Sequence, residues 1–105
     1  MATKKELKKI VKKIVEYYRP EKIILFGSQA REKGERDSDF DLFIIKRTKK
    51  DFFSRIQKIE ELLWGRKIPL DILVYTPEQI KKRLAMGDFF VEEILNKGKI
   101  LYEKK

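Results

Sequence analysis

Apolar side chains recur along this chain at two spacings, one typical of helices and the other typical of strands. Between residues 4 and 18 they return every three or four positions with lysines between them, which predicts an amphipathic helix that ends before Pro20. The same spacing predicts helices at 51–64, from Pro77 to about residue 85, and at 89–97. Short apolar runs predict strands at 23–26, 39–45 and 70–75.

Residues with special backbone preferences indicate where some of these elements begin and end. Thr76, Pro77 and Gln79 predict a helix start, because a threonine cap, an early proline and a side-chain amide suit the first helical turn. Gly65 is expected to end the helix over 51–64, since glycine readily takes the left-handed conformation found after helices. The apolar stripe of that helix is expected to be ordinary core, and so is Trp64, rather than a stacking surface for a base.

Composition limits the chemistry that this chain can perform. Its 105 residues suit one domain spanning 1–105 with a modest core. The chain has no cysteine and no histidine, so disulfides, thiolate sites and histidine bases are excluded. No apolar run approaches the roughly 20 residues that cross a bilayer, and no signal-type stretch opens the sequence. We therefore expect a cytoplasmic protein with no membrane partner.

The charge balance favours anionic partners. Lysine and arginine total 26 against 17 acidic residues, which gives a net charge of +9. Such a field attracts nucleoside triphosphates, RNA or an acidic protein, although most of the lysines are also explained as a solvated surface. The lysines of the helix over 4–18 have no aromatic residues among them, so nucleic-acid binding is the less favoured interpretation.

Three aspartates lie on two of the predicted strands. Asp39 and Asp41 are one residue apart, so they share one face of their strand, while Phe40 points to the other face. Asp71 interrupts the apolar run of the strand over 70–75, where an aspartate is disfavoured unless it has a ligand or partner. If the two strands are neighbours, the three carboxylates can hold Mg²⁺ or Mn²⁺, which prefer oxygen ligands.

A small-residue turn follows the first predicted strand. Gly27 and Ser28 come directly after that strand and open a predicted short helix over 28–31. A helix start presents free N–H groups and the positive end of the helix dipole, which together favour phosphate. A phosphate cradle near paired carboxylates indicates metal-assisted chemistry on a nucleotide.

The order Gly27, Ser28, ten residues, Asp39 and Asp41, followed by Asp71 on a later strand, resembles the nucleotidyltransferase superfamily that includes DNA polymerase beta. The short length is similar to its minimal nucleotidyltransferase branch. The resemblance implies a small α/β (α+β) nucleotidyltransferase fold, with a mixed three- to four-stranded sheet flanked by helices, and implies Mg²⁺ (or Mn²⁺) and ATP as ligands.

The resemblance also implies roles for individual residues. Gly27 and Ser28 would hold the triphosphate, while Asp39, Asp41 and Asp71 would bind metal and carry catalysis. Apart from the resemblance, Arg31 is close enough in sequence to Ser28 to neutralise charge on the leaving group, with a surface role as the equal alternative. The implied role of Asp71 includes activation of the acceptor hydroxyl. Glu32 departs from the family pattern, which has glycine at this position.

The minimal branch further implies a partner. Its members commonly act as antitoxins beside a HEPN-domain RNase toxin and transfer AMP from ATP to a toxin tyrosine. The apolar residues Phe89, Phe90, Ile94 and Leu95 are expected to supply part of the docking surface. The alternative is a catalytically silent module that binds nucleotide, or covers the toxin, without turnover.

Overall fold

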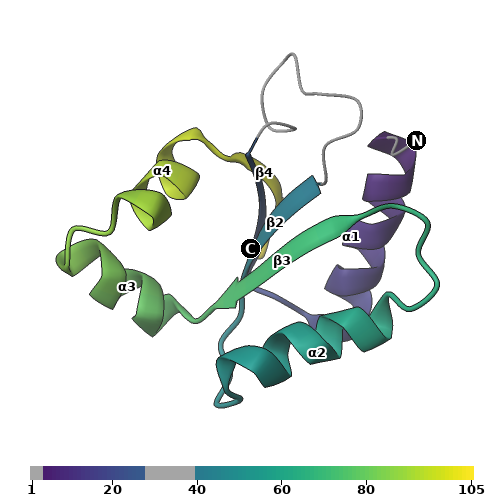
Figure 1. The fold of residues 1–105 in the computed structure, drawn as a ribbon, viewed down its shortest axis with the longest axis horizontal. Helices are drawn as coiled ribbons and strands as arrows, with labels where there is room; N and C mark the ends of the chain where they lie inside the picture. Colours follow the sequence, from purple (N-terminus) through teal and green to yellow (C-terminus); the bar gives the residue numbers. More distant parts are fainter. Residues whose placement is uncertain (1–3, 28–39) are drawn as a thin grey trace.

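A mixed β-sheet with helices on both faces organises the described part of the chain (Figure 1). The computed structural model describes residues 4–27 and 40–105. Its helices are α1 (Lys4–Tyr18), α2 (Phe52–Leu62), α3 (Pro77–Ala85) and α4 (Phe89–Lys97). Its strands are β1 (Lys22–Phe26), β2 (Phe40–Ile45), β3 (Leu70–Tyr75) and β4 (Lys99–Glu103).

The four described strands lie in the order β3-β2-β1-β4. β1 runs antiparallel to both of its neighbours, whereas β2 and β3 run parallel and are connected through α2. A parallel pair needs a crossover connection, which explains why a helix separates these two strands in the sequence. This mixed α/β arrangement confirms the predicted fold class.

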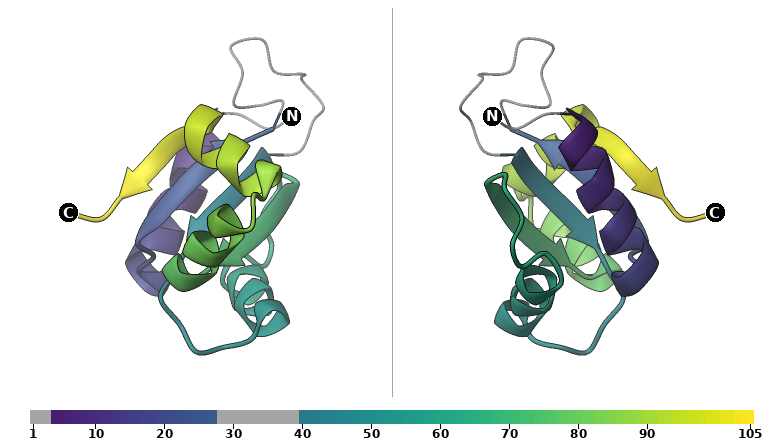
Figure 2. Two further views of the ribbon diagram at one scale, coloured as in Figure 1. Left: turned by 90° about the vertical axis from the view of Figure 1, so that its left-hand side faces the viewer. Right: turned by 90° about the vertical axis from the view of Figure 1, so that its right-hand side faces the viewer.

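Two hydrophobic cores form because each sheet face carries alternate residues of the strands. On one face, Leu42 and Ile44 pack with residues of α1 and α2 such as Ile14 and Ile59. On the opposite face, Phe43 and Ile45 belong to a second cluster that includes residues of α3 and α4. Figure 2 shows α3 and α4 over one side of the sheet in its left view, and α1 and α2 over the other side in its right view.

Side-chain caps begin three of the helices. The Thr76 hydroxyl accepts a hydrogen bond from the backbone N–H of Gln79 at 3.1 Å, and the Gln79 Oε1 accepts one from the Thr76 N–H at 3.0 Å, which forms the predicted capping box. Asp51 caps α2 and Asp88 caps α4. The Ser54 backbone N–H donates to the Asp51 carboxylate, and this hydrogen bond lowers the pKa of that carboxyl.

Arg55 of α2 connects three elements although it is buried. Its Nε donates to the backbone oxygen of Lys50 at 2.7 Å, and its guanidinium also donates to the backbone oxygen of Val74 and to the Gln79 side chain. Because Gln79 belongs to the cap of α3, Arg55 joins α2 to the end of β3 and to the start of α3.

The structure corrects the prediction for Trp64. We expected this residue in the core, but the helix ends at Leu62, Leu63 takes the last buried position, and Trp64 lies in the following turn with 89% of its surface exposed. Gly65 adopts the predicted left-handed conformation, with φ of +85°. The sequence pattern had extended this helix two residues too far.

Two further differences concern the C-terminal part of the chain. The pattern did not assign a strand at 99–103, where β4 lies at the sheet edge with mostly exposed or half-buried residues. Ile94, expected in an exposed apolar patch, is a core residue with 3% exposure, because it packs against the sheet in the second cluster.

No helix within 4–27 or 40–105 combines the length and hydropathy that a membrane span requires.

Candidate functional site

Asp41 and Asp71 lie opposite each other on neighbouring strands. β2 and β3 run parallel, and their register pairs Asp41 with Asp71. Neighbouring strands are about 4.8 Å apart, and side chains at paired positions point to the same face. The structure therefore brings together two of the three aspartates that the sequence predicts as a cluster.

These two aspartates lie on the sheet face that α3 and α4 cover. Side chains alternate along each strand, so Asp41 shares a face with Phe43, and Asp71 shares a face with Tyr75. Phe43 and Tyr75 both pack in the cluster with α3 and α4. Phe40 packs in the cluster with α1 and α2, on the opposite face, as the alternation of β2 predicts.

Gly27 provides the space that the Asp41 carboxylate occupies. It follows β1 with φ of +77°, a backbone conformation that side chains disfavour. A Cβ atom built at this position would overlap the Asp41 Oδ2 atom. β1 pairs antiparallel with β2, and Phe26 is the cross-strand partner of Asp41. Both the backbone angle and the neighbouring carboxylate therefore require glycine at the end of β1.

The exposure and charge of the pair suit a cationic ligand. Asp71 is exposed and Asp41 is half-buried. Within the described part of the chain Asp71 forms no ion pair. Two carboxylates about 4 Å apart repel each other by roughly 4 kcal/mol at an effective dielectric constant of about 20. A hard divalent cation relieves that repulsion and prefers oxygen ligands, so these two residues fit the metal that the family resemblance implies.

The other predicted site residues lie outside the described residues. These are Ser28, Arg31 and Asp39, and the same holds for the predicted helix over 28–31 and for Glu32. Among residues 4–27 and 40–105, no group of three or more potential metal-ligating side chains is found. Asp39 lies outside the described residues, so that search did not include it. The roles of Ser28, Arg31 and Asp39 stay predictions.

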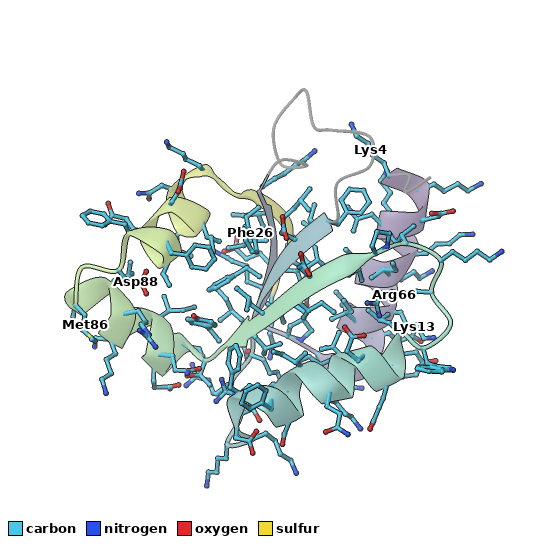
Figure 3. The ribbon with its side chains drawn as sticks, viewed as in Figure 1. Lys4, Lys13, Phe26, Arg66, Met86 and Asp88 are labelled. Carbon is cyan, nitrogen blue, oxygen red and sulfur yellow. The ribbon has the colours of Figure 1, made fainter. Side chains whose placement is uncertain are left out.

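Phe26 is a neighbour of the site that sequence reasoning did not single out. Its ring lies on the same face as Asp41, because cross-strand partners point to the same side of an antiparallel pair. Figure 3 shows Phe26 between the end of β1 and α4. Its position immediately before Gly27 could have indicated this, because the end of a strand beside a phosphate turn is where a ligand arrives.

A surface groove of about 430 Å³ lies between the end of α2 and the start of β3. Trp64 and Lys67 line it, together with Arg66, whose guanidinium pairs with Glu60 at 2.9 Å. Neither Asp41 nor Asp71 lines this groove, so it is separate from the carboxylate pair.

Three comparisons with known proteins bear on the family and the fold of this chain. A family model described as "Polymerase beta, Nucleotidyltransferase" matches residues 8–105. A protein of Methanocaldococcus jannaschii, named "Putative protein adenylyltransferase", is 31% identical over 104 residues, which cover 97% of this chain and 100% of that protein. The crystal structure of a "putative nucleotidyltransferase" from Sulfolobus solfataricus superposes with a TM-score of 0.66 over 95% of this chain and 79% of that chain. At 19% identity, that likeness shows the fold alone.

Proposed function

Because this chain belongs to the polymerase beta nucleotidyltransferase family, it is a nucleotidyltransferase, and we propose that it transfers AMP from ATP to a tyrosine of a HEPN-domain toxin, for which it is the antitoxin. The name of the Methanocaldococcus jannaschii relative supports a protein as the acceptor. The observation that carries the proposal is the register pairing of Asp41 with Asp71 beside Gly27.

In this proposal Asp39, Asp41 and Asp71 hold Mg²⁺ or Mn²⁺. The bound cation would neutralise the charge of the phosphates and of the leaving pyrophosphate. Gly27 and Ser28, with Arg31, hold the triphosphate of ATP.

The proposed reaction is an in-line displacement at the α-phosphorus. The tyrosine oxygen forms the new bond to phosphorus, the bond to the β-phosphate oxygen breaks, and pyrophosphate leaves. Asp71 is more exposed to solvent than Asp41, which suits Asp71 to accept the tyrosine proton. The product is a toxin that carries AMP on its tyrosine.

An exposed apolar surface on α4 supports a protein partner. Phe89 is 83% exposed, and Leu95 is half-buried on the same helix. Exposed aromatic residues are typical of protein interfaces. We therefore propose that the toxin docks at Phe89 and Leu95. Ile94 is excluded because it is buried in the second core, and Phe90 because its ring contacts Phe26.

The alternative is neutralisation by binding alone. In that case the chain covers the toxin, or binds nucleotide, without transfer, because the fold does not require catalysis. Transfer of AMP separates the two functions.

The test is intact-protein mass spectrometry of a HEPN-type protein encoded by the neighbouring gene, after incubation with this chain, ATP and Mg²⁺. We expect the toxin to gain the mass of AMP with the wild type and to gain none with Asp41→Asn or Asp71→Asn. Both variants should still bind the toxin, because the docking surface lies on α4.

The matched control is Asp51→Asn, which makes the same chemical change at the cap of α2, where asparagine also caps well. This variant should transfer AMP like the wild type. A toxin that is bound and neutralised but carries no AMP would favour the binding-module alternative.

A further inference from the structure

An aromatic pair extends the carboxylate site toward α4. The rings of Phe26 and Phe90 meet edge to face, with centroids 5.7 Å apart and an interplanar angle of 87°. Phe26 also meets Phe43 of the second core, at 6.4 Å and 85°. Phe26 is therefore held from two sides, while Phe90, on the first turn of α4, keeps 47% of its surface exposed.

The sheet order places this pair at one end of a row that begins with the carboxylates. β3, β2 and β1 are successive neighbours, and Asp71 pairs with Asp41, which pairs in turn with Phe26. All three side chains point to the face covered by α3 and α4. Across this face the order is therefore Asp71, Asp41, Phe26 and then Phe90.

The two ends of this row have different chemistry. Asp71 and Asp41 offer oxygen ligands to a cation, whereas Phe26 and Phe90 offer apolar, flat surface. A nucleotide combines a charged triphosphate with a flat base that stacks on aromatic rings. We propose that Phe90, positioned by Phe26, is the stacking surface for the adenine base of ATP, an inference that rests on the proposed function.

The position of the acceptor favours the base as the occupant of this surface. The proposed function assigns proton transfer from the acceptor tyrosine to Asp71, which lies at the far end of the row. The triphosphate is assigned to the turn at Gly27, which directly follows Phe26. The base is part of the ATP whose triphosphate is assigned to the turn beside Phe26, so the base lies at this end of the row. The acceptor approaches from the other end, at β3.

Isothermal titration calorimetry with Mg²⁺ tests this proposal by comparing ATP with tripolyphosphate, which has no base. In Phe90→Ala we expect ATP affinity to fall by about tenfold, within the range measured for base–aromatic stacking, and tripolyphosphate affinity to stay unchanged. Phe90→Trp should retain ATP affinity, because tryptophan stacks as well.

Phe53→Ala is the matched control. Phe53 is an 80% exposed phenylalanine on α2 whose ring also meets a neighbour, Phe52, edge to face at 5.8 Å. It lies on the helix that packs in the other core, so ATP affinity should not change. Circular dichroism of each variant separates loss of stacking from loss of fold, and Phe90→Leu provides a second variant that keeps the apolar contact with Phe26.

Three results would overturn the proposal. If ATP binds Phe90→Ala as tightly as the wild type, the base does not stack on this ring, while the proposed function stands. If Phe90→Ala raises the KM for the toxin and leaves ATP affinity unchanged, the ring serves the acceptor. If the wild type binds neither ATP nor tripolyphosphate, both the base site and the proposed function are wrong.

Discussion

At the scale of single residues, Gly27 controls how closely the end of β1 approaches the carboxylates. Its φ of +77° is costly for any residue with a side chain, and the Asp41 carboxylate fills the space where a Cβ would lie. The first constraint concerns stability and the second concerns the geometry of the site. Two glycine variants can separate these effects.

We predict that Gly27→Ala and Gly65→Ala each lower the free energy of unfolding by about 1–2 kcal/mol, the cost of a left-handed alanine. Only Gly27→Ala should also displace Asp41, and its AMP transfer should fall by about a hundredfold, as small misplacements in a site can cause. Gly65 has φ of +85°, and a Cβ built there would meet no atom within 4 Å, which makes it the matched control. Chemical denaturation and transfer assays measure the two effects, and equal transfer by both variants would contradict the assignment of Gly27.

At the scale of elements, Arg55 links the start of α3 by hydrogen bonds to α2 and to the end of β3. Thr76 is 6% exposed and forms the capping box with Gln79, whose side chain also accepts a hydrogen bond from Arg55. Loss of the Thr76 hydroxyl therefore leaves the part-buried backbone N–H of Gln79 without its acceptor. That loss is costly because buried polar groups cannot recover hydrogen bonds from water.

Thr76→Ala should lower the free energy of unfolding by about 1 kcal/mol, the usual cost of removing a helix cap. For a domain of this size that change corresponds to a fall in Tm of about 4–8 °C. Thr76→Ser keeps the hydroxyl that accepts from the Gln79 N–H, so its Tm should stay near that of the wild type. Calorimetry of the three proteins checks this, and equal values for Thr76→Ala and the wild type would show that the cap contributes nothing.

At the scale of the whole molecule, charge and ligand binding are connected. The chain carries a net charge of +9, whereas its proposed active site begins with two carboxylates on adjacent strands. The surrounding positive charge attracts the triphosphate, and the carboxylates attract the cation that accompanies it. The folded protein should therefore gain stability from Mg²⁺ and ATP together.

We predict that ATP with Mg²⁺ at about 100 times the dissociation constant stabilises the fold by about 2.7 kcal/mol, because only the native state binds. The corresponding rise in Tm is about 10 °C or more. Asp71→Asn should show a much smaller rise, and Asp51→Asn should respond like the wild type. An unchanged Tm of the wild type at saturating Mg²⁺ and ATP would count against the site.

Local signals in the sequence were sufficient for most elements. The predicted bounds of the helix over 4–18 and the strand over 70–75 agree with α1 and β3, and the cap at Thr76 forms as predicted. These features depend on residues within one or two turns of each other, so short segments of the chain are sufficient to determine them. The same local pattern could not place Trp64, whose exposure depends on where α2 stops, nor identify β4, which is stable only because it pairs with β1.

By itself, the sequence determined which residue types are available for chemistry: carboxylates on strands, a glycine turn after a strand, and neither histidine nor cysteine. The alternation of β2 also determined that Asp41 points away from Phe40. Only the tertiary structure decided that Asp71 lies beside Asp41 and that Phe90 reaches Phe26, since both depend on strand register and helix packing between segments far apart in the chain. The strands pair in the arrangement that gives the whole sheet and both cores the lowest free energy. A short segment does not contain the residues that decide this.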